Sequence, residues 1–181
     1  MRKTAILVLA AATLAACAET GPAPPPIPPP IRTAPPNPPQ PPPTHDLFRE
    51  SDFAWSYAPG SGKVVGQLAY RGMGRYTCGK AILTPETPWT RERMQILYLS
   101  DLTADVPVEE ARARTPTAHE QEYERFVRVA DCDPSGRFTF SGLPNGAWYM
   151  ITSATPVGGG AKMALMRRVE THGATVAITL R

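Results

Sequence analysis

The chain has 181 residues and a formal net charge of +3 at pH 7, a length that suffices for one folded domain with additional segments. Arg2 and Lys3 supply two of the positive charges, and without the N-terminal segment that carries them the balance falls to +1. This small charge argues against the strongly basic class of nucleic-acid-binding domains, so we expect no nucleic-acid partner.

Residues 1–16 are predicted to be a signal peptide. A positive start at Arg2 and Lys3 precedes the apolar run 6–14, which is shorter than the ~20 residues that a membrane-spanning helix needs. The segment Leu14-Ala-Ala-Cys17 resembles the lipobox of bacterial lipoproteins. The resemblance implies cleavage before Cys17 and lipidation of that residue, so that residues 17–20 form the lipidated N-terminus. The alternative is an ordinary signal peptide followed by a chance cysteine.

The residues after Cys17 bear on localisation. In Gram-negative lipoproteins an Asp beside the cysteine is the familiar signal for retention in the inner membrane, and this chain has Ala18 and Glu19 instead. We therefore expect a protein anchored by lipid in the bacterial outer membrane and facing the periplasm. With Cys17 assigned to lipid, Cys78 and Cys132 remain, and an oxidising periplasm favours a disulfide between them. Two buried free thiols are the alternative.

Residues 21–45 form a proline-rich linker. Proline lacks a backbone N–H and fixes φ, so this segment favours polyproline II over helix or sheet interior. About 22 such residues at ~3.1 Å each would reach roughly 70 Å if fully extended. We interpret the segment as a spacer that holds the domain away from the membrane. A ligand for a proline-recognition module is the alternative.

The folded domain is predicted to span residues 46–181. Its N-terminal part is too aromatic to be linker, and eight later runs carry strand patterns bounded by turn residues. The predicted strands are 64–70, 77–84, 93–100, 125–130, 136–142, 148–153, 163–169 and 174–180. The segment 101–122 is predicted to be a short helical insertion, with Asp105 capping one helix and a capping box at Thr117–Glu120 opening another. We therefore predict an all-β fold, an antiparallel sandwich of about 7–8 strands.

The stretch 136–153 is the most distinctive part of the domain. Phe138 and Phe140 alternate with polar residues, as expected of a strand with one buried face. Trp148 and Met150 follow after a turn and would join the same core. Asp133 is expected to accept hydrogen bonds from backbone N–H groups in the turn before this stretch.

Three segments together resemble the carboxypeptidase regulatory-like, transthyretin-like (prealbumin-type) and collagen-adhesin B-type sandwich domains. They are Gly62-Lys-Val-Val-Gly-Gln-Leu68, Ala81-Ile-Leu-Thr-Pro85 and Asp133-Pro-Ser-Gly-Arg-Phe-Thr-Phe-Ser-Gly-Leu-Pro-Asn-Gly-Ala-Trp-Tyr149. The resemblance covers about residues 62–180 and implies an Ig-like or transthyretin-like fold more than an activity. The Tyr-Arg-Gly-Ser ending of the hydroxyisourate hydrolases in this group is replaced here by Ile178-Thr-Leu-Arg181, so that activity is set aside.

No stretch of the sequence predicts a metal or catalytic site. The run 131–136 resembles the start of a calcium loop, but the position of the bidentate Glu is occupied by Gly142, so a turn is favoured. His45, His119 and His172 have no metal-ligand partner at useful spacing. No nucleophile elbow occurs. We therefore expect no metal and no cofactor.

The best candidate binding residues are Trp89, Arg91 and Arg93. Packing of Trp89 in the core or at a sheet edge is the favoured interpretation, and the alternative is an exposed Trp89, with Arg91 and Arg93 behind it, that contacts sugar or peptidoglycan. The sequence thus predicts a non-enzymatic lipoprotein that binds or scaffolds, with the membrane, an envelope protein or peptidoglycan as partners. The alternatives are an accessory or degenerate hydrolase domain and a carbohydrate- or peptidoglycan-binding module.

Overall fold

The computed structural model describes residues 47–181 except 73 and 117. The predicted signal peptide, Cys17, the linker 21–45, His45 and Thr117 lie outside the described residues. The N-terminal elements are the 3-10 helix η1 (Glu50–Tyr57), β1 (Gly62–Leu68), β2 (Tyr76–Thr77), β3 (Lys80–Pro85), α1 (Pro88–Tyr98), β4 (Thr103–Pro107), α2 (Val108–Ala113) and α3 (Glu120–Glu124). They are followed by β5 (Arg128–Asp131), β6 (Arg137–Leu143), β7 (Gly146–Pro156), β8 (Met163–Thr171) and β9 (Thr175–Leu180).

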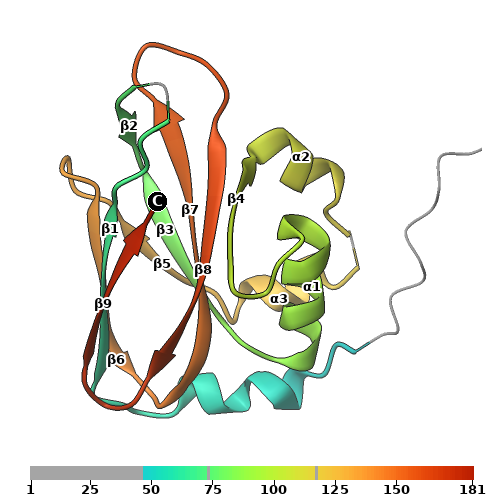
Figure 1. The fold of residues 1–181 in the computed structure, drawn as a ribbon. Helices are drawn as coiled ribbons and strands as arrows, with labels where there is room; N and C mark the ends of the chain where they lie inside the picture. Colours follow the sequence, from blue (N-terminus) through green and yellow to red (C-terminus); the bar gives the residue numbers. More distant parts are fainter. Residues whose placement is uncertain (1–46, 73, 117) are drawn as a thin grey trace, which may run out of the picture. The chain divides into compact units, whose positions relative to one another are not determined.

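The strands form two sheets of unequal width that face each other. The narrow sheet has the order β6-β1-β9, and the wide sheet has the order β4-β8-β7-β3-β5, with β2 paired to one end of β7. All pairs are antiparallel except β1 with β9, which is parallel. The predicted all-β sandwich is therefore confirmed. Helices α1, α2 and α3 lie on the side of the wide sheet away from the narrow one (Figure 1).

The interior of the sandwich is built from the alternating residues that the sequence indicates. Phe138 and Phe140 of β6 are 3% and 5% exposed and face Trp148 and Met150 of β7, both fully buried. Trp148 keeps its indole N–H satisfied by donating to Thr171 Oγ1 at 3.1 Å. Gly66 of β1 lies under the Phe138 ring, and a Cβ at this position would be 2.1 Å from that ring, so only glycine fits.

The turn before β6 has the predicted chemistry. Asp133 Oδ1 accepts hydrogen bonds from the backbone N–H groups of Ser135 at 2.8 Å and Arg137 at 2.9 Å. These bonds, above all that from the Arg137 N–H, hold the pKa of Asp133 below its usual value. Gly136 adopts φ +75°, a conformation that side chains disfavour, and completes the turn.

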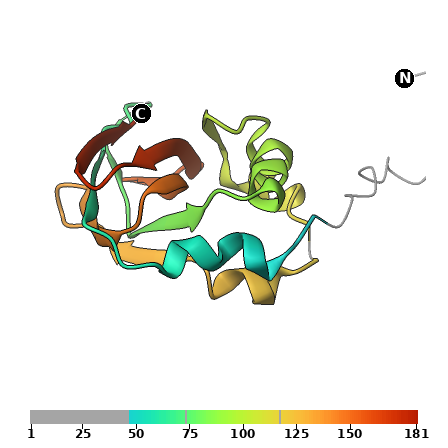
Figure 2. The ribbon, with the colours of Figure 1, turned by 90° about the horizontal axis from the view of Figure 1, so that it is seen from below.

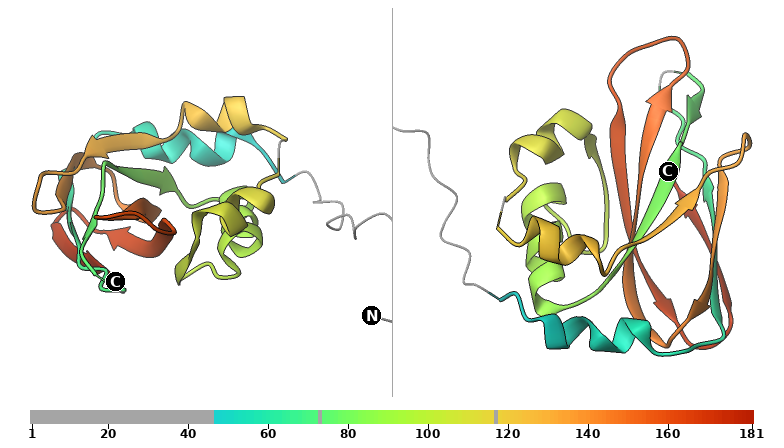
Figure 3. Two further views of the ribbon diagram at one scale, coloured as in Figure 1. Left: turned by 90° about the horizontal axis from the view of Figure 1, so that it is seen from above. Right: turned by 180° about the vertical axis from the view of Figure 1, so that it is seen from behind.

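The other face of the wide sheet is covered by helices. Tyr149 of β7 and Met166 of β8 point away from the sandwich and pack against Met94 and Leu97 of α1. A third cluster joins η1 to the helices through Phe53, Trp89, Tyr123 and Phe126. Figure 2 and Figure 3 show η1 crossing the end of the domain between the helices and the start of β1.

The predicted strand at 93–100 is wrong, because this segment lies in α1. Thr87 Oγ1 accepts the Thr90 N–H at 3.1 Å, the Thr87 N–H donates to Thr90 Oγ1 at 2.7 Å, and Pro88 occupies the first turn. These interactions start a helix before the apparent alternation begins. The buried residues recur at spacings of three and four, which is the period of a helix; they are Trp89, Thr90, Arg93, Met94, Leu97 and Tyr98.

The insertion 101–122 is helical only in part. It begins with β4, which pairs with β8 along the edge of the wide sheet. Asp105 lies inside this strand and caps no helix; α2 begins at Val108 after Pro107. The residue at the N-cap of α3 is His119, with φ +61° and no side-chain capping bond. The insertion therefore contributes a strand as well as helices.

The Cys78–Cys132 disulfide is confirmed, with Cα atoms 5.8 Å apart. Cys78 lies between β2 and β3, and Cys132 follows β5, so the bond ties the β3–β5 edge of the wide sheet. It closes a loop with a sequence separation of 54.

Replacing Phe140 with Ala should lower the free energy of unfolding by about 3–5 kcal/mol, because it leaves a cavity between the sheets. Thr139→Ala on the exposed face of the same strand is the matched control and should change it by less than about 0.5 kcal/mol. Urea unfolding measures both. A loss below about 1 kcal/mol for the Phe140 variant would show that this ring is not part of the core.

Replacing both Cys78 and Cys132 with Ala should lower the free energy of unfolding by about 4 kcal/mol on the chain-entropy model for a loop of this length. Denaturant unfolding of the variant and the parent gives the difference. Two titratable thiols in the native parent, with unchanged melting after reduction, would contradict the bond.

Candidate functional site

Trp89 is not the exposed aromatic residue that a flat sugar-binding face would need. It is 9% exposed and packs in the cluster around η1, with its ring centroid 5.3 Å from that of Phe48 and 5.0 Å from that of Tyr123. The helical turn that follows Thr87 directs the side chain inward. Of the two interpretations of Trp89, packing in the core describes this residue, and an exposed Trp89 on a sugar-binding face does not.

Arg93 and Arg91 form ion pairs that hold elements of the fold together. The Arg93 guanidinium lies 5.3 Å from the ring centroids of both Trp89 and Tyr123 and binds Glu120 Oε2 at 2.6 Å, and its side chain is 6% exposed. Arg91 is more exposed and holds Glu86 Oε1, whose carboxylate also accepts from Arg168 Nε at 2.6 Å. The buried Glu86 carboxylate thus ties the start of α1 to β8.

The described residues contain a groove along one open edge of the sandwich. The narrow sheet has three strands, so its edge strand β9 lies opposite β8, and β4 extends past it. Arg167 of β8 pairs with Thr103 of β4, which places both side chains on the sandwich face of the wide sheet. The result is a cavity of about 390 Å³, lined by Thr103, Ala104, Leu165, Met166, Arg167, Ala177, Ile178, Thr179, Leu180 and Arg181.

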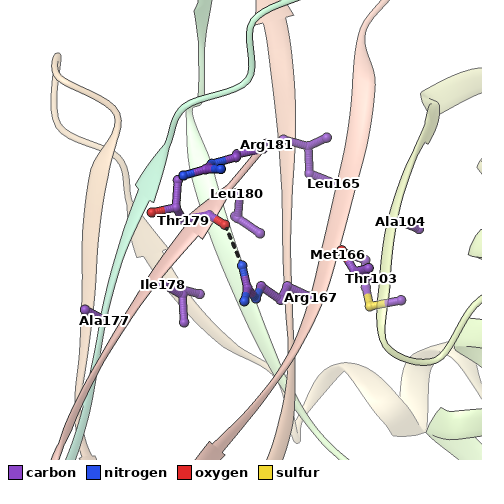
Figure 4. Close-up of a pocket in the computed structure, with 10 residues that line it drawn as sticks. All are labelled: Thr103, Ala104, Leu165, Met166, Arg167, Ala177, Ile178, Thr179, Leu180 and Arg181. Atoms are coloured by element: carbon purple, nitrogen blue, oxygen red, sulfur yellow. Dashed lines mark hydrogen bonds between the residues drawn. The ribbon is translucent and has the colours of Figure 1, made fainter.

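Arginine side chains dominate the polar lining of this groove. Figure 4 shows Arg167 and Arg181 extending into the space between β8 and β9. Arg167 Nη1 donates to the Thr179 carbonyl oxygen at 3.1 Å, which leaves its other N–H groups available. The side chain of Arg181 is exposed. This cavity and the adjoining cavity lined by Ala69, Tyr70, Arg71 and Arg181 are together called the edge groove.

The adjoining cavity lies where the chain leaves β1. Its volume is about 470 Å³, and Ala69, Tyr70, Arg71 and Arg181 line it, so that Arg181 is common to both cavities. Tyr70 packs edge-on against Tyr76, with ring centroids 4.8 Å apart. Burial raises the pKa of Tyr70, and Tyr76 and Asp105 raise it further.

A third cavity is apolar and lies beneath the helices. It measures about 470 Å³ and is lined by Ile82, Arg93, Met94, Leu97, Tyr98, Glu120, Tyr123, Glu124, Val127, Val129 and Ile151. Val129 of the edge strand β5 is 55% exposed. The Tyr123 hydroxyl is bound to Thr84 Oγ1 at 2.5 Å, and burial raises the pKa of both Tyr98 and Tyr123 to about 12.

The histidines do not assemble into a site within the described part of the chain. His119 stacks on Phe48 with ring centroids 4.6 Å apart, and His172 Nε2 lies 3.4 Å from Glu170 Oε2. Among residues 47–181, apart from the two left undescribed, no group of three or more His, Cys, Asp or Glu side chains could hold a metal ion. Over the same residues, no helix is long and apolar enough to cross a membrane.

Sequence reasoning missed the edge groove, although a signal for it is present. Leu165 and Val169 are apolar residues on the sandwich face of β8, and Arg167 stands between them at a position where the alternation predicts another apolar side chain. In β4, Ala104 and Val106 alternate with Thr103 and Asp105, which is a strand pattern with one polar face. The pairing of β4 with β8 brings Thr103 and Arg167 side by side, and the sequence does not show this pairing.

Comparison with known proteins supports the fold. No protein-family model matches the chain, and no curated protein matches it. Among solved structures, the chain is similar to a proposed carbohydrate-binding protein from Pseudomonas aeruginosa, with a TM-score of 0.50 and 23% sequence identity. The match covers 73% of this chain and 97% of the other. At this identity the likeness shows a shared fold.

Three of the six tyrosines should lose their hydroxyl proton only at high pH. Burial raises the pKa values of Tyr98, Tyr123 and Tyr149 to about 12, from about 10 when unfolded. Because the folded state holds these protons more tightly, their contribution to stability is complete below about pH 10 and is lost as the pH rises towards 12. Absorbance at 295 nm measures the titration, and Tyr123→Phe should remove one late step. Titration of all six near pH 10 in the native protein would contradict the burial.

Proposed function

We propose that this protein is a non-enzymatic carbohydrate-binding module of the bacterial envelope. The observation that carries the proposal is the edge groove, two adjoining cavities at an open sheet edge whose lining contains guanidinium groups, threonine hydroxyls and the ring of Tyr70. Such a mixture suits sugars, whose hydroxyls need hydrogen-bond partners and whose ring faces pack on apolar groups. The fold shared with a proposed carbohydrate-binding protein supports the same reading.

The attachment of the module is part of the proposal. The Leu14–Cys17 segment would place a lipid on Cys17, and the proline-rich residues 21–45 would hold the domain at a distance from the outer membrane. A groove on a tethered domain could then reach glycans in the periplasm, including peptidoglycan. In this proposal Tyr70, Arg71, Arg167 and Arg181 take the binding roles that the sequence suggested for Trp89, Arg91 and Arg93.

The test is binding of the purified chain to a panel of glycans, by isothermal titration for soluble polymers and by co-sedimentation for peptidoglycan sacculi. The panel contains dextran, xylan, polygalacturonate, alginate and sacculi. At least one should bind. Thr103→Trp, which fills the floor of the groove, should abolish that binding, whereas Thr175→Trp at an exposed position of β9 outside the groove should retain it. Binding to none of the panel, or equal binding by both variants, would contradict the proposal.

A second candidate function, protein scaffolding, is favoured by the apolar cavity beneath the helices. Its rim includes the exposed Val129 on an edge strand, which could receive an apolar segment of an envelope protein. Val129→Asp should then remove a specific protein partner from a pull-down, whereas Thr103→Trp should leave the partner bound. Loss of capture with Thr103→Trp and not with Val129→Asp would contradict this candidate.

A further inference from the structure

The arginines of the described residues differ in whether they pair with a carboxylate. Seven of them form ion pairs with carboxylates; they are Arg91, Arg93, Arg112, Arg114, Arg125, Arg137 and Arg168. The others make no ion pair with any described residue; they are Arg49, Arg71, Arg75, Arg128, Arg167 and Arg181. Of these, Arg71, Arg167 and Arg181 are exposed and line the edge groove. The positive charge of the groove is therefore not neutralised by ion pairing within this part of the protein.

The chemistry of the remaining lining agrees with this charge. Among the described residues that line the two cavities there is no Asp or Glu. Asp105 of β4 lies close enough to Tyr70 to raise its pKa, but it lines neither cavity. The lining also contains neutral groups, including the hydroxyl-bearing Thr103 and Thr179. These neutral groups suit the uncharged parts of a ligand.

We propose that the edge groove selects polysaccharides that carry carboxylates, such as polymers of uronic acids. This inference rests on the proposed carbohydrate-binding function and adds the charge of the ligand. A planar carboxylate matches the fork of a guanidinium group and can accept two hydrogen bonds from it. A uronic-acid polymer carries such a carboxylate on each sugar together with neutral hydroxyls, and the lining offers both guanidinium groups and neutral polar groups. Duplex nucleic acid, with about one charge per 1.7 Å, calls for a denser basic surface.

The first measurement uses two polymers that differ only in charge. Polygalacturonate should bind the purified full chain at least about tenfold more tightly than its fully methyl-esterified form, because esterification removes the carboxylates and keeps the backbone. Raising the salt concentration from 0.05 to 0.5 M should weaken the binding of the acid form, since ions screen exposed charges. Alginate is tested in parallel as a second carboxylated polymer, and inorganic polyphosphate as an anion without sugar.

The second measurement assigns the selectivity to the groove. Arg71→Gln and Arg167→Gln should each weaken binding of the carboxylated polymer about tenfold or more, since a hydrogen bond to a charged group contributes about that factor or more. Arg49→Gln is the matched control, an exposed arginine outside the groove with no ion pair to any described residue, and should leave binding unchanged. The Arg71 side chain is exposed and makes no hydrogen bond or ion pair with any described residue, so its variant remains informative if Arg167→Gln proves unstable.

The possible results distinguish a failure of carboxylate selection from a failure of the proposed carbohydrate-binding function. Equal binding of acid and ester forms, both abolished by Thr103→Trp, would overturn the selection of carboxylates and keep the carbohydrate-binding function. Binding of the neutral glycans alone would do the same. Polyphosphate that binds as tightly as polygalacturonate with the same dependence on Arg71 would show a general anion site and overturn the inference. Ester-sensitive binding lost in the arginine variants and kept in Arg49→Gln is the result expected.

Discussion

The burial of both faces of β7 is the constraint on which the rest of the structure depends. Alternate side chains of this central strand enter two different cores: Trp148 and Met150 fill the sandwich, while Tyr149 and Ile151 meet the helices. A strand buried on both sides needs a layer on each side. The narrow sheet supplies one layer and α1 with its neighbours supplies the other. The N-terminal η1 ties the layers together, because Trp55 packs on Trp148 while Phe53 packs among the helix residues.

The edge groove is a consequence of the unequal widths of the two layers. Three strands of the narrow sheet cannot cover five of the wide sheet, and the uncovered strip falls on β4 and the adjoining side of β8. A strip of sheet exposed to water tolerates polar residues, which is what Thr103, Asp105 and Arg167 provide. The insertion that supplies β4 therefore creates the floor of the candidate site, and its two helices cover the opposite face.

Arginines near the helices are paired with carboxylates, whereas those of the edge groove are paired with no carboxylate of the described residues. Around the helices, arginines meet carboxylates and serve to hold elements together, as the buried Glu86 does between Arg91 and Arg168. In the edge groove the arginines keep their charge without a counterion from the described residues. Arginine thus holds elements together in one region and is a candidate ligand-binding group in the other. The sequence around each arginine does not distinguish the structural role from the binding role.

The sequence by itself determined the features that arise from local patterns. Alternation placed Phe138 and Phe140 in the core, turn chemistry placed Asp133 and Gly136, and the cysteine count indicated the disulfide. Only the tertiary structure decided the rest. The apolar residues of 93–100 fit the period of a strand as well as that of a helix. The cap at Thr87 starts a helix, and the apolar side chains of β7 and β8 that point away from the sandwich give this helix a surface to pack on. The same helix buries Trp89. The groove depends on contacts between strands distant in sequence, and such pairing leaves no local pattern that names its partner.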